Sequence, residues 1–200
     1  MITPRVIHLA TGNAHKVQEF QRLADGAAAG VKFVQAAAMP PVVEDAGTFL
    51  GNARKKAAAL KVVLPPEAWV LADDSGLCVD FLGGAPGVES AYYAGAAGDA
   101  AANLRKLTEV MHGVPESRRG AHFVCVLVLL GPEKIERVFE GRCGGALRPA
   151  PAGGHGFGYD PLFVPEGYAE TYAELGEEVK NKISHRGCAW LILVEWLRAG

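Results

Sequence analysis

The stretch that decides the fold is Trp69-Val70-Leu71-Ala72-Asp73-Asp74-Ser75-Gly76. Its first four residues are apolar and predict a buried strand. Side chains alternate faces along a strand, so Asp73 and Asp74 should point to opposite sides. A strand that ends in acids and then turns is where an α/β protein usually holds a metal or a reacting water. Asp-Asp-Ser-Gly is equally good turn chemistry, so these residues alone leave a site and a plain turn both open.

The composition indicates a globular protein with a substantial core. The chain has 200 residues, half of them hydrophobic, which predicts one domain or one body with two lobes around a cleft. The formal net charge is −2, so there is no basic excess and we expect no nucleic-acid partner.

The cysteines and the apolar runs indicate the compartment. The four cysteines contain no Cys-x-x-Cys pair, which favours buried free thiols in a reducing compartment; they are Cys78, Cys125, Cys143 and Cys188. The first residues lack the apolar core of a signal peptide, and the run 123–130 is too short to cross a bilayer. We therefore expect a cytoplasmic protein without a membrane partner.

The N-terminal segment reads as strand, glycine turn and helix. Val6–Ala10 predicts a buried strand, Thr11–Lys16 a turn, and Val17, Phe20 and Leu23 one face of a helix. This layout can place backbone N–H groups at an anion. Lys16 lies near the helix start, where a cation is mildly unfavourable unless it meets a negative partner. The P-loop pattern is absent, and an ordinary turn with a solvated lysine stays an alternative.

The next segment predicts a second strand at Val31–Val34 and a helix at Phe49–Val63. An apolar stripe defines the helix, comprising Phe49, Ala53, Ala57 and Leu60. Asn52 and Lys56 are four residues apart and share a neighbouring face. Glu44 precedes the helix, where it could be a cap-side anion or a metal ligand.

The middle of the chain predicts further strands around one helix. Leu77–Asp80 reads as a short strand after the Asp-Asp-Ser-Gly turn, and Asp99–Met111 as a helix. Ala121–Leu130 is almost continuously apolar, which is typical of a central strand covered on both faces. Lys134–Arg142 predicts a partly exposed return strand.

The C-terminal part contains a glycine-rich loop, Gly153–Pro161, and a cationic segment before a last helix. The loop opens no helix, so it is not a dinucleotide fingerprint. Its aromatic side chains suit a wall that stacks on a flat ligand, or a plug in the core. Lys180, His185 and Arg186 suit an anion or a polar base, although a lone histidine at a turn is usually structural.

Six motifs that stand in order along the chain carry a family resemblance. They are Thr-Gly-Asn-x-x-Lys (11–16), Phe-x-x-Asn-Ala (49–53), Ala-Asp-Asp-Ser-Gly-Leu (72–77), Gly-Gly-Ala-Pro-Gly-Val (83–88), Phe-Gly-Tyr-Asp-Pro-x-Phe (157–163) and Ile-Ser-His-Arg-Gly (183–187). Together they make nearly the whole chain resemble the inosine triphosphate pyrophosphatase family.

The resemblance implies one nucleoside triphosphate pyrophosphatase domain over residues 1–200. The expected fold is α/β, an elongated long mixed sheet with flanking helices that form two lobes around a central cleft. The expected protein is a homodimer that uses Mg²⁺. It would hydrolyse ITP, dITP and XTP to the monophosphate and pyrophosphate, removing deaminated purines from the nucleotide pool.

The motifs also imply a role for each site residue. The triphosphate would be held by Thr11, Gly12, Asn13, Ala14, His15 and Lys16. Glu44 and Asp74 would hold Mg²⁺, which takes oxygen ligands and commonly one or two carboxylates. Asp74 would also orient or deprotonate the attacking water. The remaining substrate contacts would come from Ser75, Phe157, Gly158, Tyr159, Asp160, Lys180, His185 and Arg186.

Two departures from the family pattern stand out. Many relatives have arginine where this chain has Tyr92, and the segment Gly176–Lys180 differs in the spacing of its acids and lysine. Two rival functions also stay open: a pyrophosphatase for modified pyrimidine triphosphates, and a regulator that binds a nucleotide without cleaving it. The presence of both Glu44 and Asp74 argues against the regulator, because a sensor needs no water-activating carboxylate.

Arg186 gives a prediction about base selection. A 6-oxo purine offers an acceptor at position 6, and arginine can only donate. With ATP the guanidinium would face another donor, which costs about 1–3 kcal/mol per buried unpaired group. We expect Arg186→Ala to raise the ratio of ATP to ITP hydrolysis, measured as pyrophosphate release from each. An unchanged ratio would contradict the donor argument.

Overall fold

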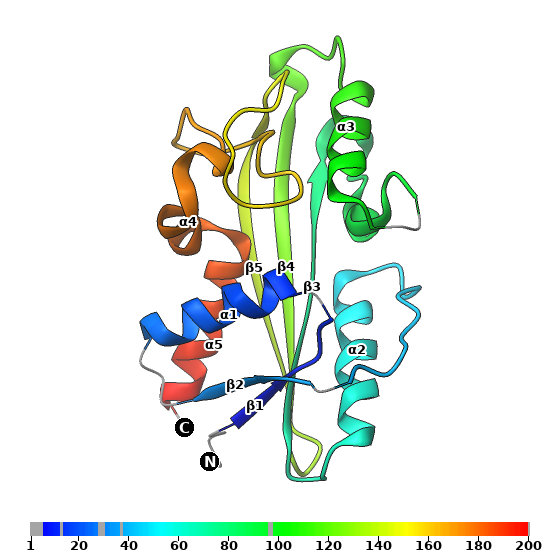
Figure 1. The fold of residues 1–200 in the computed structure, drawn as a ribbon, viewed down its shortest axis with the longest axis vertical. Coiled ribbons are helices and arrows are strands. Elements are labelled where there is room, and N and C mark those ends of the chain that lie inside the picture. The colour runs from blue at the N-terminus through cyan, green and yellow to red at the C-terminus, as the bar shows by residue number, and fades with distance from the viewer. Residues whose placement is uncertain (1–5, 13, 28–30, 37, 96–97, 200) are drawn as a thin grey trace. The chain divides into compact units, whose positions relative to one another are not determined.

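The computed structural model describes residues 6–12, 14–27, 31–36, 38–95 and 98–199. Its strands and helices are, in order, β1 Val6–Leu9, α1 Ala14–Ala27, β2 Lys32–Gln35, α2 Phe49–Val63, β3 Trp69–Val79, α3 Ala100–Val110, β4 Gly120–Leu130, β5 Glu136–Leu147, β6 Phe163–Pro165, α4 Tyr172–Ile183 and α5 His185–Ala199 (Figure 1). The strands form a mixed sheet in the order β2-β1-β3-β4-β5-β6. β1 is parallel to β2 and β3, whereas β5 and β6 are antiparallel. The predicted α/β class with a mixed sheet and flanking helices is confirmed.

The turn predicted at Asp-Asp-Ser-Gly is wrong. β3 runs without interruption from Trp69 to Val79, so the short strand expected at Leu77–Asp80 is its second half. Asp, Ser and Gly are poor strand formers, but strand propensity is weak against tertiary context. Here both acids are buried and each meets a lysine from a helix. Charge neutralisation therefore lets the strand continue through its polar residues.

The chain divides into two compact units. The first comprises Met1–Asp74, Cys125–Gly141 and Cys188–Gly200, and the second Ser75–Val124 and Arg142–Gly187. Each unit has its own hydrophobic core.

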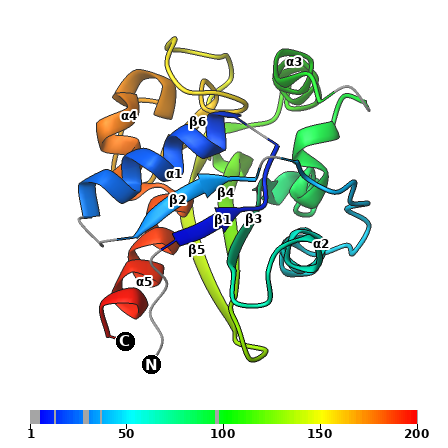
Figure 2. The ribbon, with the colours of Figure 1, turned by 60° about the horizontal axis from the view of Figure 1, so that its bottom comes forward.

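In the first unit, helices pack on both sides of the strands. α1 and α5 lie on one side of β1 and β3, and α2 lies on the other (Figures 1 and 2). Trp190 of α5 anchors the core on the α1 side, with its ring centroid 5.0 Å from that of Phe33 and 6.0 Å from that of Phe20. On the other side, α2 buries Ala53, Ala57 and Leu60 of the predicted stripe, whereas Phe49 is half-buried.

In the second unit, the core uses one face of β3 and β4. Leu77, Val79, Ala121 and Phe123 alternate along these strands and pack with residues of α3 and α4. The centroid of Phe123 lies 4.8 Å from that of Phe163, and Tyr172 of α4 lies 5.1 Å from Phe163. The alternation of side chains along β3 and β4 thus places these apolar residues on one face, where they form the core of the second unit.

Most other predicted elements are confirmed. α2 has the predicted bounds, β4 begins one residue earlier than predicted, and α3 is one residue shorter than predicted at each end. β5 starts later and ends later than the predicted Lys134–Arg142 strand, because Gly144 and Gly145 continue it beside β6. β6 was not predicted. All four cysteines are free thiols, as expected, although only Cys125 is fully buried.

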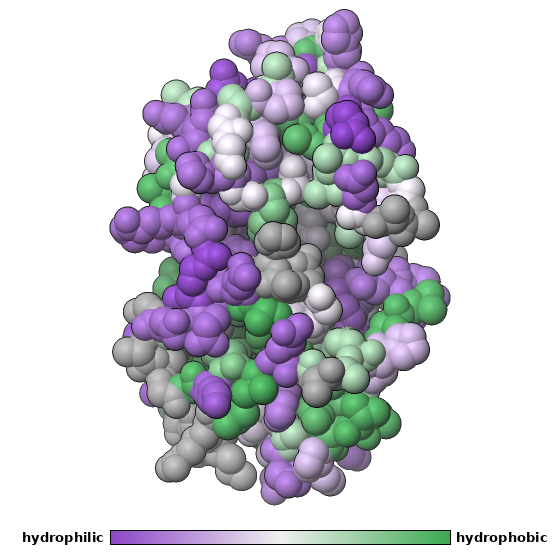
Figure 3. Space-filling model, in the orientation of Figure 1, coloured by the Kyte–Doolittle hydropathy of each residue, from purple (hydrophilic) through white to green (hydrophobic). Residues whose placement is uncertain are grey.

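Apolar side chains are exposed at the C-terminal end of α2. Figure 3 shows apolar residues gathered over the lower end of α2. Val62 and Val63, which are 84% and 61% exposed, belong to this end of the helix. In the described part of the chain, no helix is both long and apolar enough to cross a membrane.

The two adjacent glycines of β5 give a test of the β5–β6 pairing. A Cβ at Gly145 would overlap the backbone carbonyl oxygen of Val164, whereas one at Gly144 would sit 3.6 Å from the Glu166 carboxylate, an ordinary contact. We expect Gly145→Ala to lower the free energy of unfolding by about 1–3 kcal/mol. Gly144→Ala is the matched control and should stay within about 1 kcal/mol of wild type.

Urea unfolding of both variants measures the difference. Equal midpoints for the two variants would show that the close approach of β6 does not depend on a glycine at position 145.

Candidate active site

The two aspartates of β3 serve opposite faces of the strand. Asp73 and Asp74 are 3% and 6% exposed. Lys16 of α1 places its Nζ 2.8 Å from Asp73 Oδ2, whereas Asp74 is bound from α2. α1 and α2 lie on opposite sides of β3, so the predicted alternation is confirmed (Figure 2). A lysine near the start of a helix is unfavourable unless it meets a negative group, and Asp73 is that group for Lys16.

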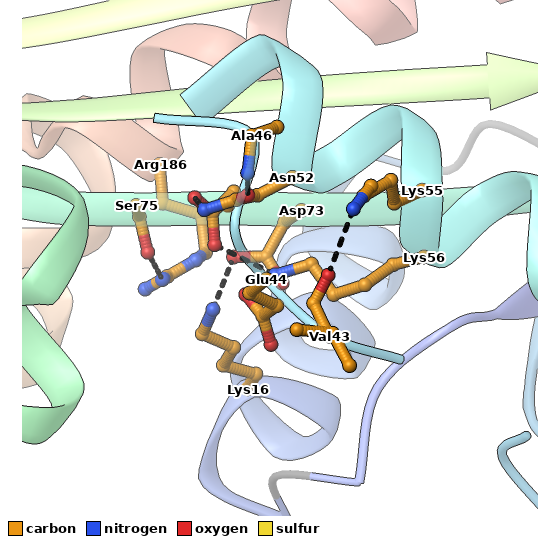
Figure 4. Close-up of polar contacts among 11 residues, drawn as sticks. Lys16, Val43, Glu44, Ala46, Asn52, Lys55, Lys56, Asp73, Ser75 and Arg186 are labelled. Carbon is orange, nitrogen blue, oxygen red and sulfur yellow. Dashed lines mark hydrogen bonds and ion pairs between the residues drawn. The ribbon is translucent and has the colours of Figure 1, made fainter. Parts of the chain in front are cut away.

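Lys56 joins two carboxylates. Its Nζ lies 2.6 Å from Asp74 Oδ1 and 2.8 Å from Glu44 Oε2. The Lys56–Asp74 contact is buried, whereas the Glu44 side chain is 31% exposed. Figure 4 shows Lys56 beside Glu44. Glu44 is therefore not the helix cap. Thr48 caps α2 instead, because its Oγ1 accepts from the Gly51 N–H.

Asn52 lies one helical turn before Lys56 on α2 and also connects Asp74 to the segment that precedes this helix. Its Oδ1 accepts from the Ala46 N–H at 3.0 Å, and its Nδ2 donates to Asp74 Oδ2 at 3.4 Å. We call Lys16, Glu44, Asn52, Lys56, Asp73 and Asp74 the carboxylate cluster.

Burial and neighbouring charges shift the pKa values of Asp74 and Lys56 in opposite directions. Burial raises the pKa of Asp74 to about 6, although the positive charges of Lys56 and Lys16 lower it. Burial lowers the pKa of Lys56, but the charges of Asp73 and Asp74 and the hydrogen bonds to Asp74 and Glu44 outweigh burial and raise it overall. Asp74 therefore loses its proton just below neutral pH, which suits a general base.

The donor set of the carboxylate cluster fits a hard divalent cation. Glu44 and Asp74 reach one point in space, where they share the Lys56 ammonium. Within the described ranges, no group of three or more His, Cys, Asp or Glu residues could hold a metal. Two carboxylates with substrate oxygens and waters are a common Mg²⁺ environment, so a third protein ligand is not required.

The predicted phosphate-binding turn is described in part. Thr11 is half-buried and Gly12 is exposed, and both lie between β1 and α1. Asn13 lies outside the described residues, as do the side chains of Ala14 and His15. Lys16 thus connects this turn to the carboxylate cluster through Asp73.

In the second unit, Asp160 is the centre of another buried group. Its Oδ2 accepts from Lys180 Nζ at 2.6 Å and from the Phe157 N–H at 2.8 Å. The Lys180 ammonium lies 4.5 Å from the centroid of the Phe157 ring and 5.7 Å from that of Tyr172. We call these four residues the ring cluster. A cation over two aromatic faces is favourable, most strongly when desolvated.

The glycine-rich loop divides its aromatics between two roles. Phe157 is half-buried, whereas Tyr159 is 5% exposed and packs in the core of the second unit. The Tyr159 hydroxyl donates to the Ser90 carbonyl at 2.9 Å. Gly158 between them has φ +63°, which favours glycine. The core-plug alternative holds for Tyr159, and its contact with a substrate stays a prediction.

His185 and Arg186 begin α5 rather than lying in a turn before it. Ser184 ends α4, and its Oγ accepts from the Gly187 N–H in the first turn of α5. His185 stacks on Phe123, with centroids 4.7 Å apart and planes 12° apart. Arg186 is 1% exposed and donates from Nη2 to Ser75 Oγ at 2.9 Å (Figure 4).

Residues 7–196 match the model of the Ham1 family. The chain belongs to the Ham1 family. Its relatives include the dITP/XTP pyrophosphatase of Opitutus terrae, which is 58% identical over 199 residues, covering 96% of this chain and 98% of that protein. The predicted resemblance to the inosine triphosphate pyrophosphatase family is confirmed.

Solved structures agree with this membership. A HAM1 protein from Coxiella burnetii has a TM-score of 0.85 at 35% identity, covering 98% of this chain and 99% of that one. The nucleoside-triphosphatase / dITP/XTP pyrophosphatase from Mycobacterium abscessus has a TM-score of 0.74 at 42% identity, covering 94% and 97%.

Two residues of this Ham1 chain were missed as members of a site. Asn52 and Lys56 were predicted to share a helical face, without a chemical role for either. Both are almost fully buried and both contact Asp74. The available signal was a polar pair four residues apart on a helix whose neighbouring stripe is apolar, since buried polar groups need partners.

The raised pKa of Asp74 predicts a pH-dependent stability. Since its folded pKa of about 6 exceeds the ordinary value of 3.8, the native state holds more protons than the unfolded state between these values. Stability from this group is therefore complete below about pH 3.8 and is lost as the pH rises through 6. Asp74→Asn removes this dependence. We expect its stability relative to wild type to improve by about 2–3 kcal/mol from pH 4 to pH 7.5.

Denaturant unfolding of both proteins in chelator, at several pH values, measures this change. A stability difference that stays constant across that pH range would contradict the raised pKa.

Proposed function

We propose that this Ham1 chain hydrolyses non-standard purine nucleoside triphosphates to the monophosphate and pyrophosphate. The observation that carries the proposal is the carboxylate cluster, in which Asp74 and Glu44 both contact the buried Lys56. Membership of the Ham1 family and the names of its dITP/XTP pyrophosphatase relatives support the same activity. ITP, dITP and XTP are the proposed substrates.

Asp74 is the proposed base. Water is a weak nucleophile, and a positioned carboxylate with a pKa near 6 can accept its proton at neutral pH. Attack cleaves the bond between the α- and β-phosphates, and pyrophosphate leaves. Lys16, with the turn Thr11–His15, would bind the triphosphate, and its ammonium would neutralise charge that develops on the phosphates.

Glu44 and Asp74 would hold a magnesium ion. The fit rests on the chemistry of the donor set, because a buried and a half-buried carboxylate both come within contact of the Lys56 ammonium. When bound, Mg²⁺ supplies positive charge to the phosphate oxygens. Lys56 lies in contact with both carboxylates, so its charge adds to the same region.

The groups proposed for the base and sugar come from the glycine-rich loop and from the segment around Arg186. Phe157 offers an aromatic face, and the Asp160–Lys180 pair holds its backbone and ring. Arg186, bonded to Ser75, offers guanidinium donors, which match the 6-oxo group of a deaminated purine. His185 lies beside Arg186 and is held by its stack on Phe123.

The proposal also includes expectations about the domain organisation, the oligomeric state and the compartment. Residues 1–200 act as one nucleoside triphosphate pyrophosphatase domain, and the protein forms a homodimer. It works in the cytoplasm, where the nucleotide pool it would clean is found.

The test is pyrophosphate release from ITP, dITP, XTP, GTP, ATP and dTTP in parallel, with Mg²⁺ and with chelator. We expect release mainly from ITP, dITP and XTP, and only with Mg²⁺. Asp74→Asn should lower the rate by at least about 100-fold because it removes the proposed base. Its far-ultraviolet spectrum and unfolding transition serve as the folding control.

The alternatives give different outcomes. Strong activity on a pyrimidine triphosphate would keep the chemistry and replace the base assignment. Binding of ITP without pyrophosphate release would indicate the regulator. Near-normal turnover by Asp74→Asn would remove Asp74 from the mechanism.

A further inference from the structure

The carboxylate cluster contains two parallel connections between β3 and the segment 44–46. In one, the Lys56 ammonium joins Asp74 Oδ1 to Glu44 Oε2. In the other, the Asn52 amide joins Asp74 Oδ2 to the Ala46 N–H. The two residues are one turn apart on α2, and each binds a different oxygen of Asp74.

The partners determine which way the Asn52 amide points. The Ala46 N–H can only donate, so it must face the amide oxygen. The amide nitrogen then faces Asp74, where a carboxylate oxygen can only accept. Asn52 is 1% exposed, so these two protein contacts, and not water, satisfy its amide group.

The two connections differ in chemistry. The Lys56 contacts are ionic and depend on the charge of Asp74 and Glu44. The Asn52 contacts join a neutral amide to the backbone of 44–46, and one end is independent of any charge. Asn52 is therefore suited to hold the Glu44 segment in place against Asp74 when the charge of either carboxylate changes.

We propose that Asn52 is a positioning residue of the active site, which holds the Glu44-bearing segment against Asp74. The proposal rests on the proposed function for its effect on turnover. Asn52 acts through Asp74 and Glu44 rather than on the substrate. Misplacement of a reacting carboxylate by about 1 Å is enough to cost about 100-fold in rate.

Thr48→Ala is the matched control. Thr48 caps the same helix one turn earlier, through its hydroxyl and the Gly51 N–H, and has no bond to Asp74 or Ala46 among the contacts described. The backbone bond from the Asn52 N–H to the Thr48 carbonyl survives this change. Thr48→Ala thus weakens the start of α2 and leaves the Asn52 amide contacts in place.

Two substitutions at Asn52 separate its contacts. Asn52→Ala removes both. Asn52→Asp has nearly the same shape and keeps an acceptor for the Ala46 N–H, but it replaces the donor to Asp74 with a carboxylate. We expect Asn52→Ala to lower kcat by about 10- to 100-fold with KM within about threefold of wild type. Asn52→Asp should lower kcat at least as much.

Amide hydrogen exchange of Ala46, measured by NMR without nucleotide or metal, gives a readout apart from activity. We expect exchange at least about tenfold faster in Asn52→Ala, and near the wild-type rate in Asn52→Asp and Thr48→Ala. Thr48→Ala should keep kcat within about threefold of wild type.

Several outcomes overturn the proposal. One is a kcat for Asn52→Ala within threefold of that for Thr48→Ala, and another is wild-type kcat in Asn52→Asp. Unchanged Ala46 exchange in Asn52→Ala also overturns it, even if wild type hydrolyses no triphosphate. Absence of turnover by the wild-type protein would refute the proposed function. The exchange rates of the Ala46 amide would then be the test of whether Asn52 holds the segment 44–46 in place.

Discussion

The ion pairs of Lys56 with Asp74 and Glu44 are the contacts on which the first unit depends. β3 carries two nearly buried carboxylates through the interior, and an unpaired buried charge is strongly destabilising. Lysines from α1 and α2 offset part of that cost, one on each side of the strand. The contacts that allow the strand to continue are the same ones that gather the acids of the candidate site. Fold and chemistry therefore share their residues here.

The second unit also contains a buried pair of an aspartate and a lysine, but this pair has a different role. Asp160 and Lys180 form a buried pair at 2.6 Å, but the carboxylate also binds backbone and the ammonium lies over two rings. The pair organises an aromatic side chain instead of a second acid. In both units, a buried lysine thus pairs with a buried aspartate.

The sequence predicted periodic elements well and polar partnerships poorly. α2 and β4 were found because apolar spacing reports burial directly. The uninterrupted course of β3 was missed because local turn chemistry ignores the lysines that neutralise its acids. Asn52, Lys56 and the anchoring role of Tyr159 depend on neighbours distant in sequence. Family motifs indicated Glu44 and Asp74, but periodicity could not show that one ammonium joins them.

Consecutive residues of β3 each meet a different helix. Asp73 contacts α1, Asp74 contacts α2 and Ser75 contacts α5 through Arg186. Adding or deleting one residue in this strand would exchange its faces and send every one of these side chains to the wrong neighbour. Evolution of this Ham1 chain can therefore proceed by substitution along β3, but changes in length must fall in its loops.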